Sequence, residues 1–211
     1  SPYFINNEKQ EVHLQNPYIL LVNERIELFN DIAPVVKQIV DSGKRDFVII
    51  AEGFGQDVLS RLVVYKYQGL FSPLLVETPG YGDKRFELLQ DICSVVGGNI
   101  VNPKVGDKIG ETKIEQLGKC ESVNSKKDKT VLVGGQGSPD ERVSILKEIL
   151  ENATLQEKEE LKKRVASLIG GISVIRVGAK TEYEQKTIKA KVEDSVNATK
   201  VAFKDGVVPG A

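Results

Sequence analysis

Short apolar runs alternate with amphipathic segments between residues 46 and 96, and this alternation constrains the fold more than any other feature of the sequence. The runs DFVIIAE (46–52) and SPLLVET (72–78) have the length and aliphatic content of buried strands. The segments 56–69 and 83–96 carry apolar residues at helical spacing, and Asp83 is a candidate N-cap. Strand, helix, strand, helix is typical of a parallel sheet with flanking helices. We therefore predict an α/β fold with a parallel-sheet βαβ core.

The remaining segments add a β-rich layer to this core and then a small α+β segment. We expect strands at 12–14 and 18–22, a helix over 24–41, a hairpin-like strand pair within 119–135, helices over 140–152 and 156–168, a strand within 170–179 and a last helix from Tyr183 to Phe203. The pair Gly170–Gly171 precedes a strand and a highly charged helix. It is the strongest domain-boundary signal in the chain.

The composition excludes several classes of protein. A formal net charge of −1 gives no reason to expect a nucleic acid or an anionic membrane as partner. No apolar run approaches the roughly 18 residues of a membrane span. Cys93 and Cys120 lie far apart and form no CxxC motif, which favours two reduced, buried thiols over a disulfide. The chain has no methionine and ends in turn-like sequence, so we expect it to be an excised part of a longer protein.

The helix expected at 56–69 has more apolar surface than one core contact requires. Val58, Leu62 and Tyr65 fall within about 60° of each other on a helical projection and form an ordinary core stripe. A second stripe, displaced by roughly 100–140°, contains Leu59, Val63 and Tyr67, while Val64 stands apart from both.

The preceding helix repeats the pattern. One stripe comprises Leu28, Ile32, Val35 and Ile39, and an adjacent one comprises Phe29, Ala33, Val36 and Val40. Two interpretations are open. Both stripes of each helix are core, or the second stripes stay exposed side by side as an apolar groove that binds extended or helical apolar segments. The pattern alone does not decide between them.

Several motifs resemble the group I chaperonins, the GroEL family. They are SPYFIN at 1–6, IIAE at 49–52, PGYGDKR at 79–85, LQDI at 89–92 and KVEDSVNATK at 191–200. The similarity extends over essentially all of the chain, in the same order and with few gaps. It implies that residues 1–172 are the apical domain, 173–204 the C-terminal half of the intermediate domain and 205–211 the start of the equatorial domain.

The resemblance also implies a binding surface for non-native polypeptides and for the mobile loop of a co-chaperonin. In that family both ligands occupy a groove between two neighbouring helices, above an extended segment. The matching positions are Tyr3, Phe4, Phe29, Ala33, Val36, Leu59, Val63 and Val64. Ala33 stands where the family usually has leucine, so we expect a shallower groove there, partly filled by Phe29 one turn earlier. Tyr65 replaces a polar residue, and its hydroxyl either lies at the groove edge or faces inward.

Only the resemblance to the chaperonins implies ATP chemistry. Asp194 matches the catalytic aspartate of the family, and Gly210 matches part of a glycine turn that contacts the nucleotide. Phosphoryl transfer also needs positioned phosphates and a metal ion. In the family these come from segments that precede residue 1, so we expect no cofactor and no enzymatic activity in this chain alone. ATP and Mg would belong to the full-length protein.

The resemblance implies a homo-oligomeric ring for the full-length protein and a monomer for this fragment. It places the protein in the cytoplasm, with the mitochondrial matrix or plastid stroma as alternatives, and Glu182 matches a glutamate used between subunits. The rival hypothesis is an α/β enzyme with a small-molecule site at the strand ends near Glu52–Gly55 and Pro79–Gly82. No nucleophile–base pair supports it. His13 is the only histidine, so a metal site is not expected either.

Overall fold

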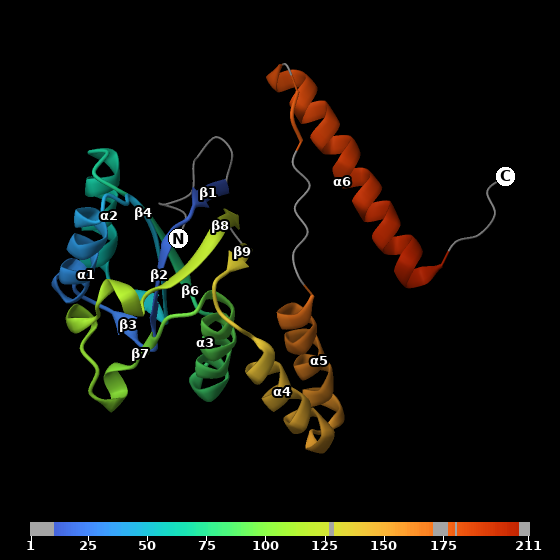
Figure 1. The fold of residues 1–211 in the computed structure, drawn as a ribbon, viewed down its shortest axis with the longest axis horizontal. Coiled ribbons are helices and arrows are strands. Elements are labelled where there is room, and N and C mark those ends of the chain that lie inside the picture. The colour runs from blue at the N-terminus through green and yellow to red at the C-terminus, as the bar shows by residue number, and fades with distance from the viewer. Residues whose placement is uncertain (1–10, 127–128, 171–176, 180, 207–211) are drawn as a thin grey trace. The chain divides into compact units, whose positions relative to one another are not determined.

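The computed structural model describes residues 11–126, 129–170, 177–179 and 181–206. It confirms the α/β fold (Figure 1). The chain divides into two compact units, Ser1–Gly171 and Ile172–Ala211. The first unit contains the sheet and most of the helices. The identification of the units with chaperonin domains stays a prediction.

A mixed sheet forms the centre of the first unit. Its strands are β1 (Glu11–Gln15), β2 (Tyr18–Val22), β4 (Asp46–Ala51), β6 (Ser72–Glu77), β7 (Ile100–Val101), β8 (Gly118–Lys126) and β9 (Thr130–Gly135). The order is β1-β8-β2-β4-β6, with β7 paired to β2 and β9 paired to β8. Strands β2, β4, β6 and β7 are parallel, whereas β8 runs antiparallel to β1, β2 and β9. The predicted parallel core and the added β-rich layer therefore belong to one sheet.

Alternate residues of the parallel strands enter two different cores. Leu20 of β2 and Phe47 of β4 belong to the cluster that contains α1 (Phe29–Asp41) and α2 (Gln56–Tyr67). Their neighbours Ile19 and Val48 belong to the cluster that contains α3 (Gly82–Val96). Because successive strand residues point to opposite faces, α1 and α2 cover one face of the sheet and α3 covers the other (Figure 1).

Two helix starts differ from the sequence-based expectation. The first helix begins at Phe29 rather than Glu24, because β3 (Arg25–Ile26) is extended and pairs with β5 (Gly53–Phe54). Hydrogen bonds from Gly55 N to Ile26 O (2.8 Å) and from Glu52 N to Glu24 O (3.1 Å) extend this pairing. Asp83 is not an N-cap, since α3 begins at Gly82 with Tyr81 as its N-cap.

Three short 3-10 helices follow β7, and a helical hairpin follows the sheet. The 3-10 helices are η2 (Pro103–Val105), η3 (Ile109–Glu111) and η4 (Ile114–Gln116). Helices α4 (Asp140–Asn152) and α5 (Leu155–Ile169) confirm the predicted pair, and a Thr154–Glu157 capping box starts α5.

The second unit contains α6 (Glu182–Asp205), which confirms the predicted last helix within two residues at each end. Thr181 caps it by accepting a hydrogen bond from Glu184 N at 3.2 Å. The strand expected within 170–179 falls mostly outside the described residues. Among the described helices, none combines the length and apolar character that a membrane crossing requires.

Candidate functional site

The inner side chains of α1 and α2 attach both helices firmly to the sheet. Ile32, Val35 and Ile39 of α1 and Val58 and Leu62 of α2 are at most 2% exposed. They are the core stripes expected from periodicity. Leu28 departs from this expectation: it is 55% exposed, because it lies before the first turn of α1, where the backbone is still extended.

A row of aromatic rings connects the two helices to the sheet. The centroids of Phe29 and Tyr65 are 5.5 Å apart, those of Tyr65 and Phe71 are 5.4 Å apart, and those of Phe71 and Phe47 are 5.5 Å apart. These distances are in the range of favourable tilted ring pairs. The Tyr65 ring thus packs against Phe29 and Phe71, and the position of its hydroxyl stays a prediction.

Asp57 of α2 fixes the start of α1. Its carboxylate accepts a hydrogen bond from Phe29 N at 2.8 Å and another from Arg61 Nε at 2.8 Å. Leu28, the N-cap of α1, makes no side-chain cap of its own, so Asp57 serves as a cap supplied by the neighbouring helix. The Phe29 amide, followed by the Arg61 guanidinium, lowers the pKa of Asp57 below its usual value. The contact sets the register of the two helices.

The second stripe of α1 is mostly buried, which corrects the expectation of an exposed groove wall. Phe29 is 8% exposed and Val36 is 4% exposed, and both belong to the core cluster. The reason lies outside α1. Tyr65 and Arg61 of α2 cover Phe29, while the segment around η3 and η4 packs against α1. Gln38 Nε2 donates to Thr112 O at 3.0 Å, and Ile114 N donates to Gln38 Oε1 at 3.2 Å.

Helix α2 and two positions of α1 keep apolar surface accessible. Leu59 and Val63 are partly buried and pack against the same cluster as Ala33 of α1. Val64 is 50% exposed. We call Ala33, Leu59, Val63 and Val64 the α1–α2 surface. Further apolar exposure lies near the C-terminal ends of the two helices, with Val40 38% exposed and Tyr67 85% exposed.

An ion pair lies at the strand ends that the rival hypothesis requires. Arg85 is 9% exposed, pairs with Glu52 and donates from Nε to Gly80 O at 3.0 Å. The Glu52 carboxylate therefore has a cationic partner within the protein. Within the described part of the chain, no three His, Cys, Asp or Glu side chains are grouped as a metal site would require.

The other residues singled out in the sequence belong to other elements than α1 and α2 or lie outside the described part. Tyr3, Phe4 and Gly210 are outside the described residues, so their predicted roles stay predictions. Asp194 and Glu182 are exposed on α6. Cys93 and Cys120 are free thiols, as expected, but only Cys120 is buried, whereas Cys93 is partly buried. Burial raises the pKa of Cys120 to about 11.

Sequence reasoning missed two acidic residues that organise the helices, Asp57 and Asp91. The spacing of Asp57 and Arg61, four residues apart on one helix, was an available signal for the first. Asp91 is 7% exposed although it carries a charge, and it stands in the apolar run LLQDI. A charge at such a position indicates a buried partner.

One comparison with known proteins bears on these observations. The model of the TCP-1/cpn60 chaperonin family matches residues 5–211. The match includes both compact units and every described helix and strand.

Proposed function

Because the chain belongs to the TCP-1/cpn60 chaperonin family, we propose that its first unit binds non-native polypeptides and that the α1–α2 surface is the contact. The family supports a chaperone role for the protein. Leu59, Val63 and Val64 keep apolar area on a helix whose opposite side is fully buried, and this observation carries the proposal. Apolar side chains that do not finish a core are typical of a binding surface.

The support beneath this surface explains how it would bind many sequences. Val58 and Leu62 hold α2 on the sheet, and Asp57 fixes its register with α1. The outer side chains are therefore presented on a rigid base, which lowers the ordering cost of binding. Aliphatic contacts impose no hydrogen-bonding pattern on the partner, so the surface selects apolar character rather than a defined sequence.

The finer assignments are proposals that rest on the motifs. We propose that the chain is of the group I type, that the same surface binds the mobile loop of a co-chaperonin, and that the full-length protein is a homo-oligomeric ring in the cytoplasm, a mitochondrial matrix or a plastid stroma. One aliphatic contact contributes at most roughly 1.5–3 kcal/mol before ordering costs are subtracted. A single surface would bind weakly, and a ring would gain avidity by presenting several. The isolated chain would be a monomer.

We also propose that nucleotide chemistry needs more than these residues. Asp194 is the described member of the ATP site that the resemblance implies, and it is an exposed carboxylate on α6. One carboxylate neither positions phosphates nor holds Mg on its own. ATP and Mg would act in the full-length protein.

The binding proposal is tested by replacing one outer side chain at a time. We expect Leu59→Ser and Val63→Ser each to weaken binding of a labelled amphipathic peptide roughly fivefold, because each loses about 1 kcal/mol of apolar contact. Val105→Ser is the matched control, since Val105 is 74% exposed on η2 and is not part of the α1–α2 surface. It should leave the Kd unchanged.

Fluorescence anisotropy gives the Kd, and circular dichroism checks the fold of each variant. Unchanged peptide binding in both α2 variants, together with a large loss of stability, would show that Leu59 and Val63 are core residues. The binding assignment would then fail.

A further inference from the structure

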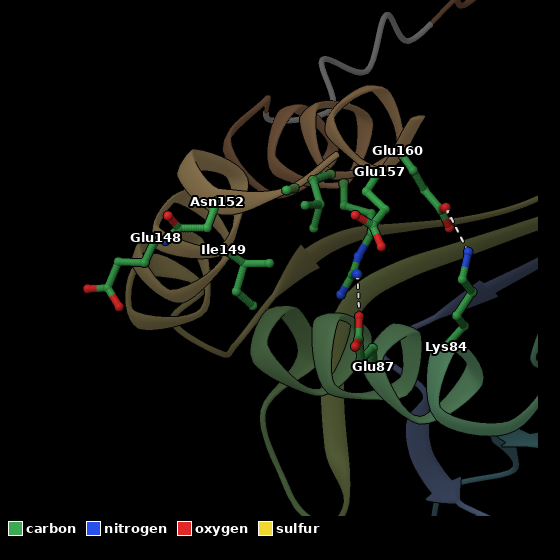
Figure 2. A pocket seen from close by; sticks show the side chains of 10 residues that line it. Lys84, Glu87, Glu148, Ile149, Asn152, Glu157 and Glu160 are labelled. Atoms are coloured by element: carbon green, nitrogen blue, oxygen red, sulfur yellow. Dashed lines mark hydrogen bonds and ion pairs between the residues drawn. The ribbon is translucent and has the colours of Figure 1, made fainter. Parts of the chain in front are cut away.

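Helix α3 has an apolar face and a polar face. Leu89 and Val96 are buried in the core cluster on the face of the sheet that α3 covers. Lys84, Glu87, Asp91 and Ser94, spaced by three or four residues, form a stripe on another face. This stripe, not an apolar one, meets the α4–α5 hairpin, as Figure 2 shows for Lys84 and Glu87.

A cluster of four charges connects the hairpin to α3. Arg142 of α4 donates from Nε to Asp91 Oδ1 at 2.7 Å, and Arg164 of α5 donates from Nε to Asp91 Oδ2 at 2.7 Å. Arg164 also pairs with Glu87 at 2.6 Å. The side chains of Asp91, Arg142 and Arg164 are only 10%, 14% and 12% exposed. We call Glu87, Asp91, Arg142 and Arg164 the Asp91 cluster.

The rest of this interface is loosely filled. A pocket of about 590 Å³ lies between α3 and the hairpin, with Glu157, Glu160 and Arg164 of α5 among the residues that line it (Figure 2). The pair Lys84–Glu160, at 3.1 Å, crosses it with both side chains more than half exposed. The hairpin's own buried residues are Val143, Leu146 and Leu161. Neither of the two core clusters of the described residues includes them.

Because of these contacts, the docking of the α4–α5 hairpin on α3 depends on the Asp91 cluster. Two arginines and two carboxylates balance in charge, and removal of Asp91 leaves the nearly buried guanidinium of Arg142 without its carboxylate partner. When the hairpin separates from α3, all four charges regain water, which offsets much of the lost attraction. An interface whose charges regain water on opening separates more easily than the central strands β2 and β4, which are buried on both faces.

The hairpin is also the part of the first unit that is followed in sequence by the second unit. Helix α5 ends at Ile169, and the second compact unit begins at Ile172. Force that reaches the first unit along this connection therefore acts first on α5 and on its contacts with α3.

We propose that the α4–α5 hairpin is a hinged element that docks on α3 through the Asp91 cluster and undocks as a unit while the sheet stays folded. Helices of 13 and 15 residues are marginal in water without further packing, so their amides exchange hydrogen faster once the hairpin leaves α3 and α4 and α5 are supported only by each other. Undocking of the hairpin is thus visible as a joint loss of protection from amide hydrogen exchange in α4 and α5.

Hydrogen exchange followed by mass spectrometry on the whole chain tests the proposal. We expect Asp91→Asn to speed exchange in both α4 and α5 at least tenfold, while the protection of β2, β4 and β6 stays within twofold of the unmodified chain. Arg164→Gln leaves Asp91 paired with Arg142, so it should give a smaller, joint acceleration of about threefold or more. Lys108→Gln removes an exposed pair with Glu111 elsewhere in the unit and should change neither region.

Two results would overturn the proposal. Exchange in the hairpin within twofold of the unmodified chain in both cluster variants would show that the cluster does not control docking. Equal acceleration in the hairpin and in β2, β4 and β6 would show that the hairpin belongs to the global folding unit. If Asp91→Asn does not fold, Arg164→Gln decides by the same criteria.

Discussion

A matched pair of valine substitutions separates the core of the α1–α2 region from its binding surface. Val36 and Val63 were both implied as contact residues by family resemblance, yet Val36 is 4% exposed and lies in the core cluster, whereas Val63 packs on that cluster from its edge. We predict that Val36→Ala lowers the free energy of unfolding and leaves peptide binding intact. Val63→Ala should weaken peptide binding and change the free energy of unfolding only a little.

The magnitudes follow from burial. Val→Ala removes two carbon groups, worth about 0.8 kcal/mol each when buried, or about 1.6 kcal/mol of transfer free energy. At Val36 the surrounding helices and η3–η4 segment are tied in place, so a residual cavity raises the total to about 2–3 kcal/mol. At Val63, which keeps solvent contact, the loss of stability should be below about 1 kcal/mol. Its loss of peptide contact should raise the Kd by up to about fivefold.

Urea unfolding followed by far-UV circular dichroism gives the free energies, with an unchanged m-value as the check that the transition is comparable. Peptide anisotropy, measured where each variant is fully folded, gives the Kd. The reasoning fails if Val36→Ala costs less than about 0.5 kcal/mol and weakens peptide binding as much as Val63→Ala. That outcome would place Val36 on the contact surface in solution.

Two further predictions concern carboxylates. The folded-state pKa of Asp57 lies below its ordinary 3.8, so its contribution to stability is present above that value and is lost as the pH falls through the folded pKa. Asp57→Asn should therefore flatten the acid side of the stability profile in urea unfolding at about pH 2–5, and an unchanged profile would show that the Phe29 contact is not formed. In a phosphate-release assay with ATP and Mg, residues 1–211 should show no turnover with or without Asp194→Ala. Turnover abolished by that substitution would contradict the proposal that more of the protein is needed.

Local patterns in the sequence predicted most of the elements correctly. The runs at 46–52 and 72–78 are β4 and β6, and the helical segments that follow are α2 and α3. These predictions succeed because a buried strand and an amphipathic helix each require a residue pattern that is visible within a few turns. The start of α1 was wrong because Arg25 and Ile26 pair with residues 53 and 54, a long-range contact without a local signal.

The site was predicted in part for the same reason. Periodicity found the stripes of α2, and the structure buries Val58 and Leu62 while leaving Val64 half exposed. It could not tell that Phe29 and Val36 are covered, since their neighbours come from α2 and from the segment after β7. The amount of surface left on a helix depends on every element packed around it.

By itself, the sequence determined the alternation of strands and helices, one core stripe on each of α1 and α2 and, through its motifs, the chaperonin family. Each of these is encoded by residues close together in the chain or by their order. Only the tertiary structure decided that Asp57 caps a neighbouring helix, that Phe29 and Val36 of α1 are buried, and that Asp91 holds two arginines of a distant hairpin. Hydrogen bonds and burial between segments more than 25 residues apart depend on how the elements pack, and helical periodicity carries no information about that packing.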